Sequence, residues 1–89
     1  MVSADTIDGG DGSDTLILGV TSLALNAASN AQLINVEKVS AANAEVAVSI
    51  TLSSQAEGFM ITGGTGNDTI MGGDGADIIN AGGGDDMIL

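Results

Sequence analysis

The sequence contains no cysteine, histidine, proline, tryptophan or tyrosine, and its single aromatic residue is Phe59. Without cysteine the chain can form no disulfide framework, and without cysteine and histidine it lacks the usual ligands of zinc. The same absences remove the commonest general base and nucleophile, and no serine has an evident partner, so we expect no enzymatic activity. A chain of only 89 residues buries little surface, which makes a bound metal the expected source of additional stability.

Basic residues are almost absent as well, because Lys38 alone stands against twelve acidic residues and the net charge is −11. No basic patch can neutralise phosphates, so nucleic acid and anionic membrane surfaces are excluded as partners. Nine of the acidic residues are aspartates, and all nine lie within residues 5–14 and 68–86. Their mutual repulsion should keep these two blocks loose until a cation binds. No apolar run approaches the roughly 18 residues of a membrane span.

Four nine-residue copies of one pattern make up the aspartate-rich blocks. One copy begins at Gly9, and three more follow one another from Gly63, Gly72 and Ala81. The sixth place of every copy is an aspartate and the eighth is a large aliphatic residue, as in Asp14 and Leu16, Asp68 and Ile70, Asp77 and Ile79, and Asp86 and Ile88. A fixed short period with a carboxylate and an apolar residue at set places predicts a stack of coils.

Each copy divides into a six-residue loop and a three-residue strand. Glycine at the first, second and fourth places permits sharp turns with positive φ, and the aspartate adds a hard oxygen anion. Carbonyl and carboxylate oxygens together suit Ca²⁺, whereas Mg²⁺ demands a stricter octahedron and soft metals find no ligands. The aliphatic residue at the eighth place is expected to point into the stack.

These copies resemble the glycine- and aspartate-rich nonapeptide repeats of the RTX (repeats-in-toxin, hemolysin-type) calcium-binding family. The resemblance implies a parallel β-roll in which two nonapeptides make one turn and Ca²⁺ binds between loops that lie two nonapeptides apart. On this chain it implies one complete calcium site, formed by Gly64, Gly66 and Asp68 of the earlier loop and Ala81, Gly83 and Asp86 of the later loop. Ala81 departs from glycine at the first place, and its carbonyl can still serve if the backbone there needs no positive φ.

The remaining loops are incomplete as calcium sites. The position two nonapeptides before Asp77 holds Phe59, so half a site remains, formed by Gly73, Gly75 and Asp77. A further possible site at the N-terminal block comprises Gly10, Gly12 and Asp14, and in the nonapeptide frame these residues would face Ala27, Ser29 and Gln32.

The chain reads as one domain in three zones: an N-terminal repeat block (1–17), degenerate solenoid coils (18–62) and C-terminal calcium-binding repeats (63–89). Gly9 and Gly63 are separated by a whole number of nonapeptides, so one continuous frame would place Leu25, Ile34, Asn43, Leu52 and Ile61 at eighth places. Asn43 breaks the pattern and predicts an irregular insert around residues 36–45. Alternating apolar residues over 46–52 predict a half-buried strand, and residues 22–44 stay ambiguous between helix and coil. The fold class expected is all-β, a parallel β-roll or β-solenoid.

Three hypotheses for function follow from these patterns. The first, implied by the resemblance, is a calcium-binding β-roll module that folds on binding Ca²⁺, from a secreted bacterial protein exported by a type I route and located outside the cell or at its surface. The alternative is a structural or adhesive segment of a surface-layer, adhesin or matrix protein that self-associates through open solenoid ends. An accessory module of a secreted protease or lipase stays open. Because Asp5 and Ile7 fit a copy that would begin before Met1, we interpret the chain as a segment of a longer protein.

Overall fold

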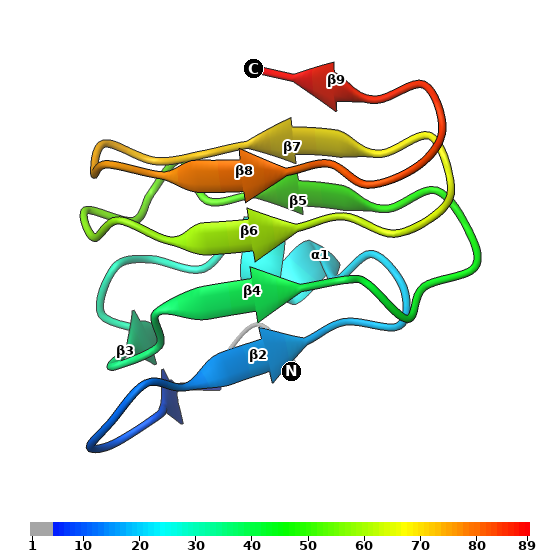
Figure 1. The fold of residues 1–89 in the computed structure, drawn as a ribbon. Helices are drawn as coiled ribbons and strands as arrows, with labels where there is room; N and C mark the ends of the chain where they lie inside the picture. The colour runs from blue at the N-terminus through cyan, green and yellow to red at the C-terminus, as the bar shows by residue number, and fades with distance from the viewer. Residues whose placement is uncertain (1–4) are drawn as a thin grey trace.

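The computed structural model describes residues 5–89, which form short parallel strands and one helical turn wound into a solenoid (Figure 1). Each strand has two or three residues. The elements are β1 (Ile7–Asp8), β2 (Thr15–Ile17), α1 (Leu23–Asn26), β3 (Leu33–Ile34), β4 (Lys38–Ser40), β5 (Ser49–Thr51), β6 (Met60–Thr62), β7 (Thr69–Met71), β8 (Ile78–Asn80) and β9 (Met87–Ile88).

Strands from successive coils pair in parallel on the faces of the solenoid. One sheet has the order β2-β4-β6-β8, a second the order β5-β7-β9, and β1 pairs with β3. Within the four-stranded sheet Leu16 lies beside Val39, Val39 beside Ile61, and Ile61 beside Ile79. The number of residues per turn of the solenoid falls along this series. It equals two nonapeptides only between Ile61 and Ile79. The predicted parallel β-solenoid is confirmed.

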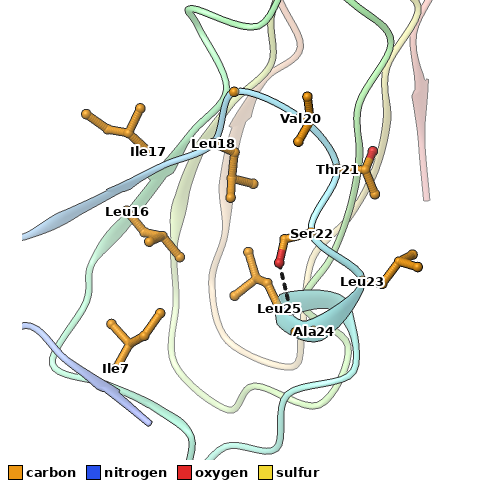
Figure 2. A pocket seen from close by; sticks show the side chains of 11 residues that line it. Ile7, Leu16, Ile17, Leu18, Val20, Thr21, Ser22, Leu23, Ala24 and Leu25 are labelled. Atoms are coloured by element: carbon orange, nitrogen blue, oxygen red, sulfur yellow. Dashed lines mark hydrogen bonds between the residues drawn. The ribbon is translucent and has the colours of Figure 1, made fainter. Parts of the chain in front are cut away.

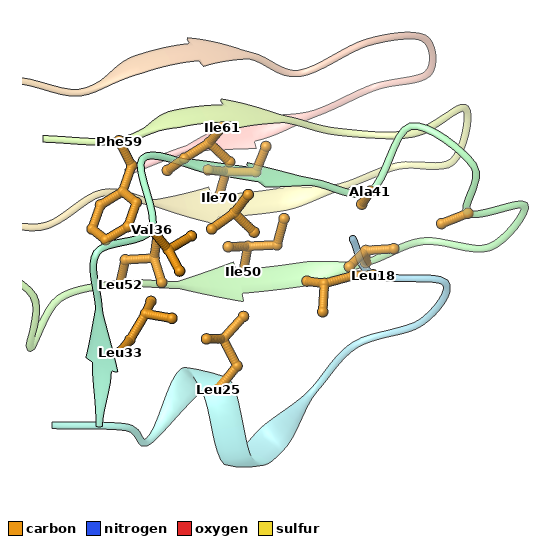
Figure 3. Close-up of a cluster of buried hydrophobic side chains, with 13 residues drawn as sticks. Leu18, Leu25, Leu33, Val36, Ala41, Ile50, Leu52, Phe59, Ile61 and Ile70 are labelled. Atoms are coloured by element: carbon orange, nitrogen blue, oxygen red, sulfur yellow. The ribbon is translucent and has the colours of Figure 1, made fainter. Parts of the chain in front are cut away.

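The core lies between the two larger sheets, and the central residues of β4, β5, β6 and β7 are part of it. Because successive residues of a strand face opposite sides, only the middle residue of a three-residue strand points inward. Val39, Ile50, Ile61 and Ile70 are each 0% exposed, and Figure 3 shows several of these side chains in one cluster with leucines and Phe59. Full burial of each such side chain stabilises the fold by about 1.5–3 kcal/mol. The inward orientation predicted for Ile61 and Ile70 is confirmed.

The middle coils do not follow the nonapeptide frame. The inward residues Val39, Ile50 and Ile61 are evenly spaced, but each interval is longer than one nonapeptide. The prediction of an irregular insert around residues 36–45 is wrong for residues 38–40, where β4 has a paired strand on each side, but an additional turn does lie at 41–44. Asn43, assigned to an inward place by the frame, is exposed.

Longer loops account for this change of period. The loops at 41–48 and 52–59 have eight residues, where the repeats have six. Each begins with a tight turn, in which the Ala44 N–H donates to the Ala41 carbonyl at 2.9 Å and the Gln55 N–H to the Leu52 carbonyl at 3.0 Å. The expected strand over 46–52 is confirmed in its later part only, because β5 spans Ser49–Thr51.

A single helical turn, α1, is all the helix that residues 22–44 contain. The Leu25 N–H donates to the Ser22 hydroxyl at 3.1 Å, which caps the start of α1. The Asn26 amide group donates to the Ser49 carbonyl at 3.0 Å, and its oxygen accepts from the Thr51 N–H at 2.9 Å. These two bonds take the place of a neighbouring strand, so α1 closes the lower edge of β5. No helix within residues 5–89 has the length and apolar character to cross a membrane.

The lower end of the solenoid holds an open hollow of about 670 Å³ between β2 and α1. Figure 2 shows Ile7, Leu16, Leu18 and Leu25 converging on it. At the rim, Val20 is 63% exposed and Leu23 is 79% exposed. This end therefore presents an apolar surface beside β2, which pairs within residues 5–89 only with β4.

Candidate metal centre

Two glycine-rich loops, 63–68 and 81–86, lie directly above one another on the side of the solenoid where β6 leads into β7 and β8 into β9 (Figure 1). The pairing of Thr69 with Met87 sets this register, and the Gly83 N–H donates to the Gly64 carbonyl at 3.1 Å. The loops two nonapeptides apart are therefore stacked as the family resemblance implies.

The sixth-place aspartates of these loops stand one above the other. Asp68 is 1% exposed, and its two carboxylate oxygens accept the N–H groups of Val48 and Gly64, each at 2.8 Å. Asp86 accepts the Asp68 N–H at 2.8 Å. Each carboxylate thus reaches down to the coil below, and this contact fixes where its oxygens lie relative to the loops.

Backbone carbonyls from both loops face the space between them. A Cβ on Gly84 would lie 2.5 Å from the Gly66 oxygen, and one on Gly82 would overlap the Gly64 oxygen. From the upper loop, the Ala81 carbonyl oxygen contacts the place where a Cβ on Gly63 would be. The predicted carbonyl ligands Gly64, Gly66 and Ala81 therefore lie at the interface of the two loops.

The backbone conformation explains which of these places require glycine. Gly82 and Gly84 have φ of +85° and +88°, a region that side chains rarely adopt. Among the described residues only Asn35 combines a positive φ with a side chain. Ala81 therefore has no positive φ, which was the condition for its carbonyl to serve as a ligand in place of that of a glycine. Gly83, by contrast, has open space, because a Cβ there would be 3.9 Å from its nearest neighbour.

The loop at 72–77 stacks on loop 52–59 and contributes one carboxylate. The Asp77 side chain accepts the Phe59 N–H at 2.9 Å, as expected from their separation of two nonapeptides. A Cβ on Gly73 would lie 2.5 Å from the Leu52 oxygen, and one on Gly75 would overlap the backbone at Glu57. The residue stacked below Asp77 is Phe59, so this vertical pair supplies only one carboxylate to the loop of Gly73 and Gly75.

The N-terminal loop at 9–14 does not lie where the nonapeptide frame placed it. That frame faced Gly10, Gly12 and Asp14 toward Ala27, Ser29 and Gln32, and this prediction is wrong. Thr15 pairs with Lys38, so Asp14 lies below Glu37, and the Asp14 N–H donates to Glu37 Oε1 at 2.8 Å. The cause is the longer first coil, in which α1 and β3 replace a plain nonapeptide pair.

Glu37 is the residue that the sequence analysis missed. It directly precedes β4, with the inward Val39 two positions later, which is the spacing of Asp14 to Leu16 and of Asp68 to Ile70. The sequence does contain a signal for this residue, namely an acidic residue two places before an aliphatic one. A search at fixed intervals of nine residues does not find it, because Glu37 lies outside that frame.

The side chain of Asp8, which directly precedes loop 9–14, accepts two hydrogen bonds. Its Oδ1 accepts the Asn35 side-chain amide at 2.8 Å and the Gly10 N–H at 2.9 Å. Both bonds lower the pKa of the Asp8 carboxyl below 3.8, and the bond from Asn35 has the larger effect.

The donor set is composed of hard oxygen atoms. In the part of the chain that the structure describes, no three acidic, histidine or cysteine side chains are grouped to hold a metal ion. A cation between loops 63–68 and 81–86 would therefore be held by two carboxylates and several carbonyls. Ca²⁺ accepts such a set, with six to eight oxygens in flexible geometry.

Comparison with known families agrees with this chemistry. A family model described as the RTX calcium-binding nonapeptide repeat (4 copies) matches residues 3–20 and 60–88. These two stretches together cover more than half of the chain and contain all four sixth-place aspartates. No curated protein and no solved structure matches the chain.

Proposed function

Because the chain belongs to the RTX calcium-binding nonapeptide repeat family, we propose that it is a calcium-binding β-roll module of a secreted bacterial protein, ordered by Ca²⁺ outside the cell. Calcium binding by a β-roll follows from the family. We add three points to it as our proposal: which residues bind the ion, that binding is coupled to folding, and that the protein is exported by a type I route. Within it, residues 63–89 hold the cation, and residues 5–62 pack in the same domain. Residues 1–4 of the N-terminal block lie outside the described part.

The stacking of Asp86 on Asp68 is the observation that carries this proposal. The two carboxylates belong to consecutive coils, and the carbonyls of Gly64, Gly66 and Ala81 lie at the same interface. Gly83, whose backbone N–H contacts the Gly64 carbonyl, would complete the set with its own carbonyl. A chain with one lysine against twelve acidic residues cannot neutralise this interface with its own side chains.

Calcium would act on folding through linkage. The ligands come from two coils and converge only when the coils are stacked, so the binding free energy adds to the free energy of folding. Free Ca²⁺ at 100 times the dissociation constant stabilises the folded state by about 2.7 kcal/mol. Extracellular modules bind Ca²⁺ with dissociation constants of about 10⁻⁴–10⁻³ M, which suits a switch between a calcium-poor cytosol and the exterior.

The experiment is a calcium titration followed by circular dichroism and calorimetry. Asp86→Asn keeps a hydrogen-bond acceptor for the Asp68 N–H but removes the charge, so calcium affinity should fall by more than about tenfold. Asp85→Asn, an exposed neighbour with the same loss of charge, is the matched control. Asp68→Ala is less informative, because it also leaves two buried N–H groups without their acceptor.

Two results would contradict the proposal. A β-sheet spectrum that is unchanged by EDTA would exclude the folding switch. Equal affinities of the Asp86→Asn and Asp85→Asn variants would exclude the ligand set.

A structural or adhesive role is the second candidate, favoured by apolar surface at both ends of the solenoid. Ile78 on the edge strand β8 and Ile17 on the edge strand β2 are each 64% exposed, and the hollow beside β2 adds further apolar surface. Unpaired strand edges with exposed apolar side chains favour the addition of another chain. Sedimentation in Ca²⁺ tests this role, because a strictly monomeric protein at high concentration would exclude it.

A further inference from the structure

The residue directly before each strand stacks on its counterpart in the next coil. Within residues 5–89 there are six such pairs of vertical neighbours: Asp14 with Glu37, Thr6 with Gln32, Glu37 with Phe59, Phe59 with Asp77, Val48 with Asp68, and Asp68 with Asp86. Only the first and the last of these place a carboxylate on both coils. The last is the calcium site of the proposed function, and the first lies at the opposite end of the solenoid.

The contacts at Asp14 and Glu37 repeat those at Asp68 and Asp86. In both pairs the N–H of the lower aspartate donates to the upper carboxylate at 2.8 Å. In both, a carbonyl of the upper segment contacts the first glycine of the lower loop, Asn35 on Gly9 in one case and Ala81 on Gly63 in the other. The lower aspartate Oδ2 lies 2.7 Å from the place of a Cβ on that glycine in each case.

One difference between the two pairs points to a cation. Asp68 Oδ2 accepts the Gly64 N–H, but the corresponding Gly10 N–H donates to Asp8 instead. Asp14 Oδ2 is consequently buried with no hydrogen-bond partner. A buried carboxylate oxygen without a partner is costly, and a bound cation removes that cost.

We propose that Asp14, Glu37 and the Asn35 carbonyl bind a second Ca²⁺, with the remaining coordination from loop 9–14 and water. This inference rests on the proposed function, since it extends the same chemistry to residues 35–37, which lie outside the family match. The upper segment has three residues between β3 and β4 where a repeat has six, and the longer glutamate side chain compensates for the shorter segment. Glu37 is exposed and fewer carbonyls are fixed, so this site binds more weakly than the one at Asp68 and Asp86.

The test is calorimetric titration of the full chain with Ca²⁺, beginning with the wild type and Glu37→Gln. The wild type should bind two ions in two phases. Glu37→Gln keeps an oxygen that can accept the Asp14 N–H and removes only the charge, so the weaker phase should be lost and the tighter phase kept. Glu45→Gln, an exposed glutamate in loop 41–48, is the matched control and should bind as the wild type does.

Two further measurements keep the result decisive if Glu37→Gln does not fold. Glu37→Asp retains the carboxylate but shortens its reach, and it should weaken the second phase by more than about tenfold. In the wild type, the backbone amide signals of Asp14 and Glu37 should shift during the weaker phase in NMR titrations. Unchanged second-phase binding in the folded Glu37 variants, or amide signals that do not move, would overturn the second site.

The design separates this inference from the proposed function. One ion in the wild type, lost in Asp86→Asn and kept in Glu37→Gln, would refute the second site and leave the proposed function standing. No calcium binding by the wild type would refute both.

Discussion

At the scale of single residues, two constraints act on the glycines of loop 81–86, and they differ from one glycine to the next. Gly82 has positive φ and lies against the Gly64 carbonyl, whereas Gly83 has neither restriction. The pattern of the repeat shows glycine at both places and does not tell them apart. Only the stacked backbone shows which one a side chain would disturb.

This contrast gives a prediction with a built-in control. Gly82→Ala forces a side chain into the left-handed region and against a predicted calcium ligand, so the calcium-bound fold should lose about 1–3 kcal/mol or more. Gly83→Ala should cost little, because its Cβ would meet nothing closer than 3.9 Å. Urea unfolding in saturating Ca²⁺ measures both, and equal losses for the two variants would contradict the described backbone.

A second prediction at this scale concerns pH. The pKa of Asp8 is lowered in the folded state, so its carboxylate stabilises the fold above pH 3.8 and this contribution disappears as the pH falls through the lower folded value. We expect the Asp8 carboxyl carbon to titrate below 3.8 in NMR spectra. Asn35→Ala removes the largest cause of the shift and should move the titration upward. An Asp8 titration that is identical in both proteins would refute the role of Asn35.

At the scale of elements, α1 and the two eight-residue loops distinguish this solenoid from a uniform stack of nonapeptides. The turn of α1 places the Asn26 side chain on the edge of β5, where it pairs with both the carbonyl of Ser49 and the N–H of Thr51. The Thr21 hydroxyl accepts the Ser49 N–H at 2.9 Å beside it. The side chains of Thr21 and Asn26 thereby cover an edge of β5 that would otherwise be open to another strand.

Removing this protection should have a measurable cost. Asn26→Ala leaves a carbonyl and an N–H on β5 without partners, and we expect a loss of about 1–3 kcal/mol in the free energy of unfolding. Asn43→Ala, at an exposed position in loop 41–48, is the control and should be nearly neutral. Chemical unfolding of the two variants side by side decides the matter, and similar stabilities would show that α1 does not secure the edge.

Strands in the C-terminal repeats could be predicted from the sequence, but those in the middle could not. For β7, the repeat itself specifies a loop of six residues and the inward Ile70. For β4 and β5, the inward residues Val39 and Ile50 have the right chemistry but follow loops of other lengths. Loop length is not written in the apolar pattern, because an extra turn outside the sheet adds residues without changing which side chain is buried.

At the scale of the whole molecule, burial is concentrated in the middle of the solenoid. The buried core runs from Leu18 to Ile70, whereas the inward Ile79 in β8 is only partly buried and Ile88 in β9 is 48% exposed. The upper coil of the proposed calcium site, which contains β8 and β9, thus has little apolar stabilisation, whereas the lower coil contains the fully buried Ile70. Ca²⁺ would contribute there what the apolar core contributes elsewhere.

Hydrogen exchange should reveal this division. In EDTA we expect the amides of β8 and β9 to exchange much faster than those of β4 to β6, because local opening follows local burial. Added Ca²⁺ should slow the exchange in β8 and β9 most. Uniform protection along the chain in EDTA would mean that the C-terminal coils are stable without the cation.

The sequence by itself determined the chemistry of this protein: a repeat of nine with aspartate and aliphatic residues at set places dictates stacked coils, inward aliphatics and oxygen ligands. The resemblance to the RTX repeats, with two nonapeptides per turn, implied that Asp86 lies above Asp68, and the strand register agrees. Only the tertiary structure decided that Glu37, not Gln32, lies above Asp14. The reason is geometric, because α1 and the irregular first coil change the number of residues per turn, and vertical neighbours depend on that number alone.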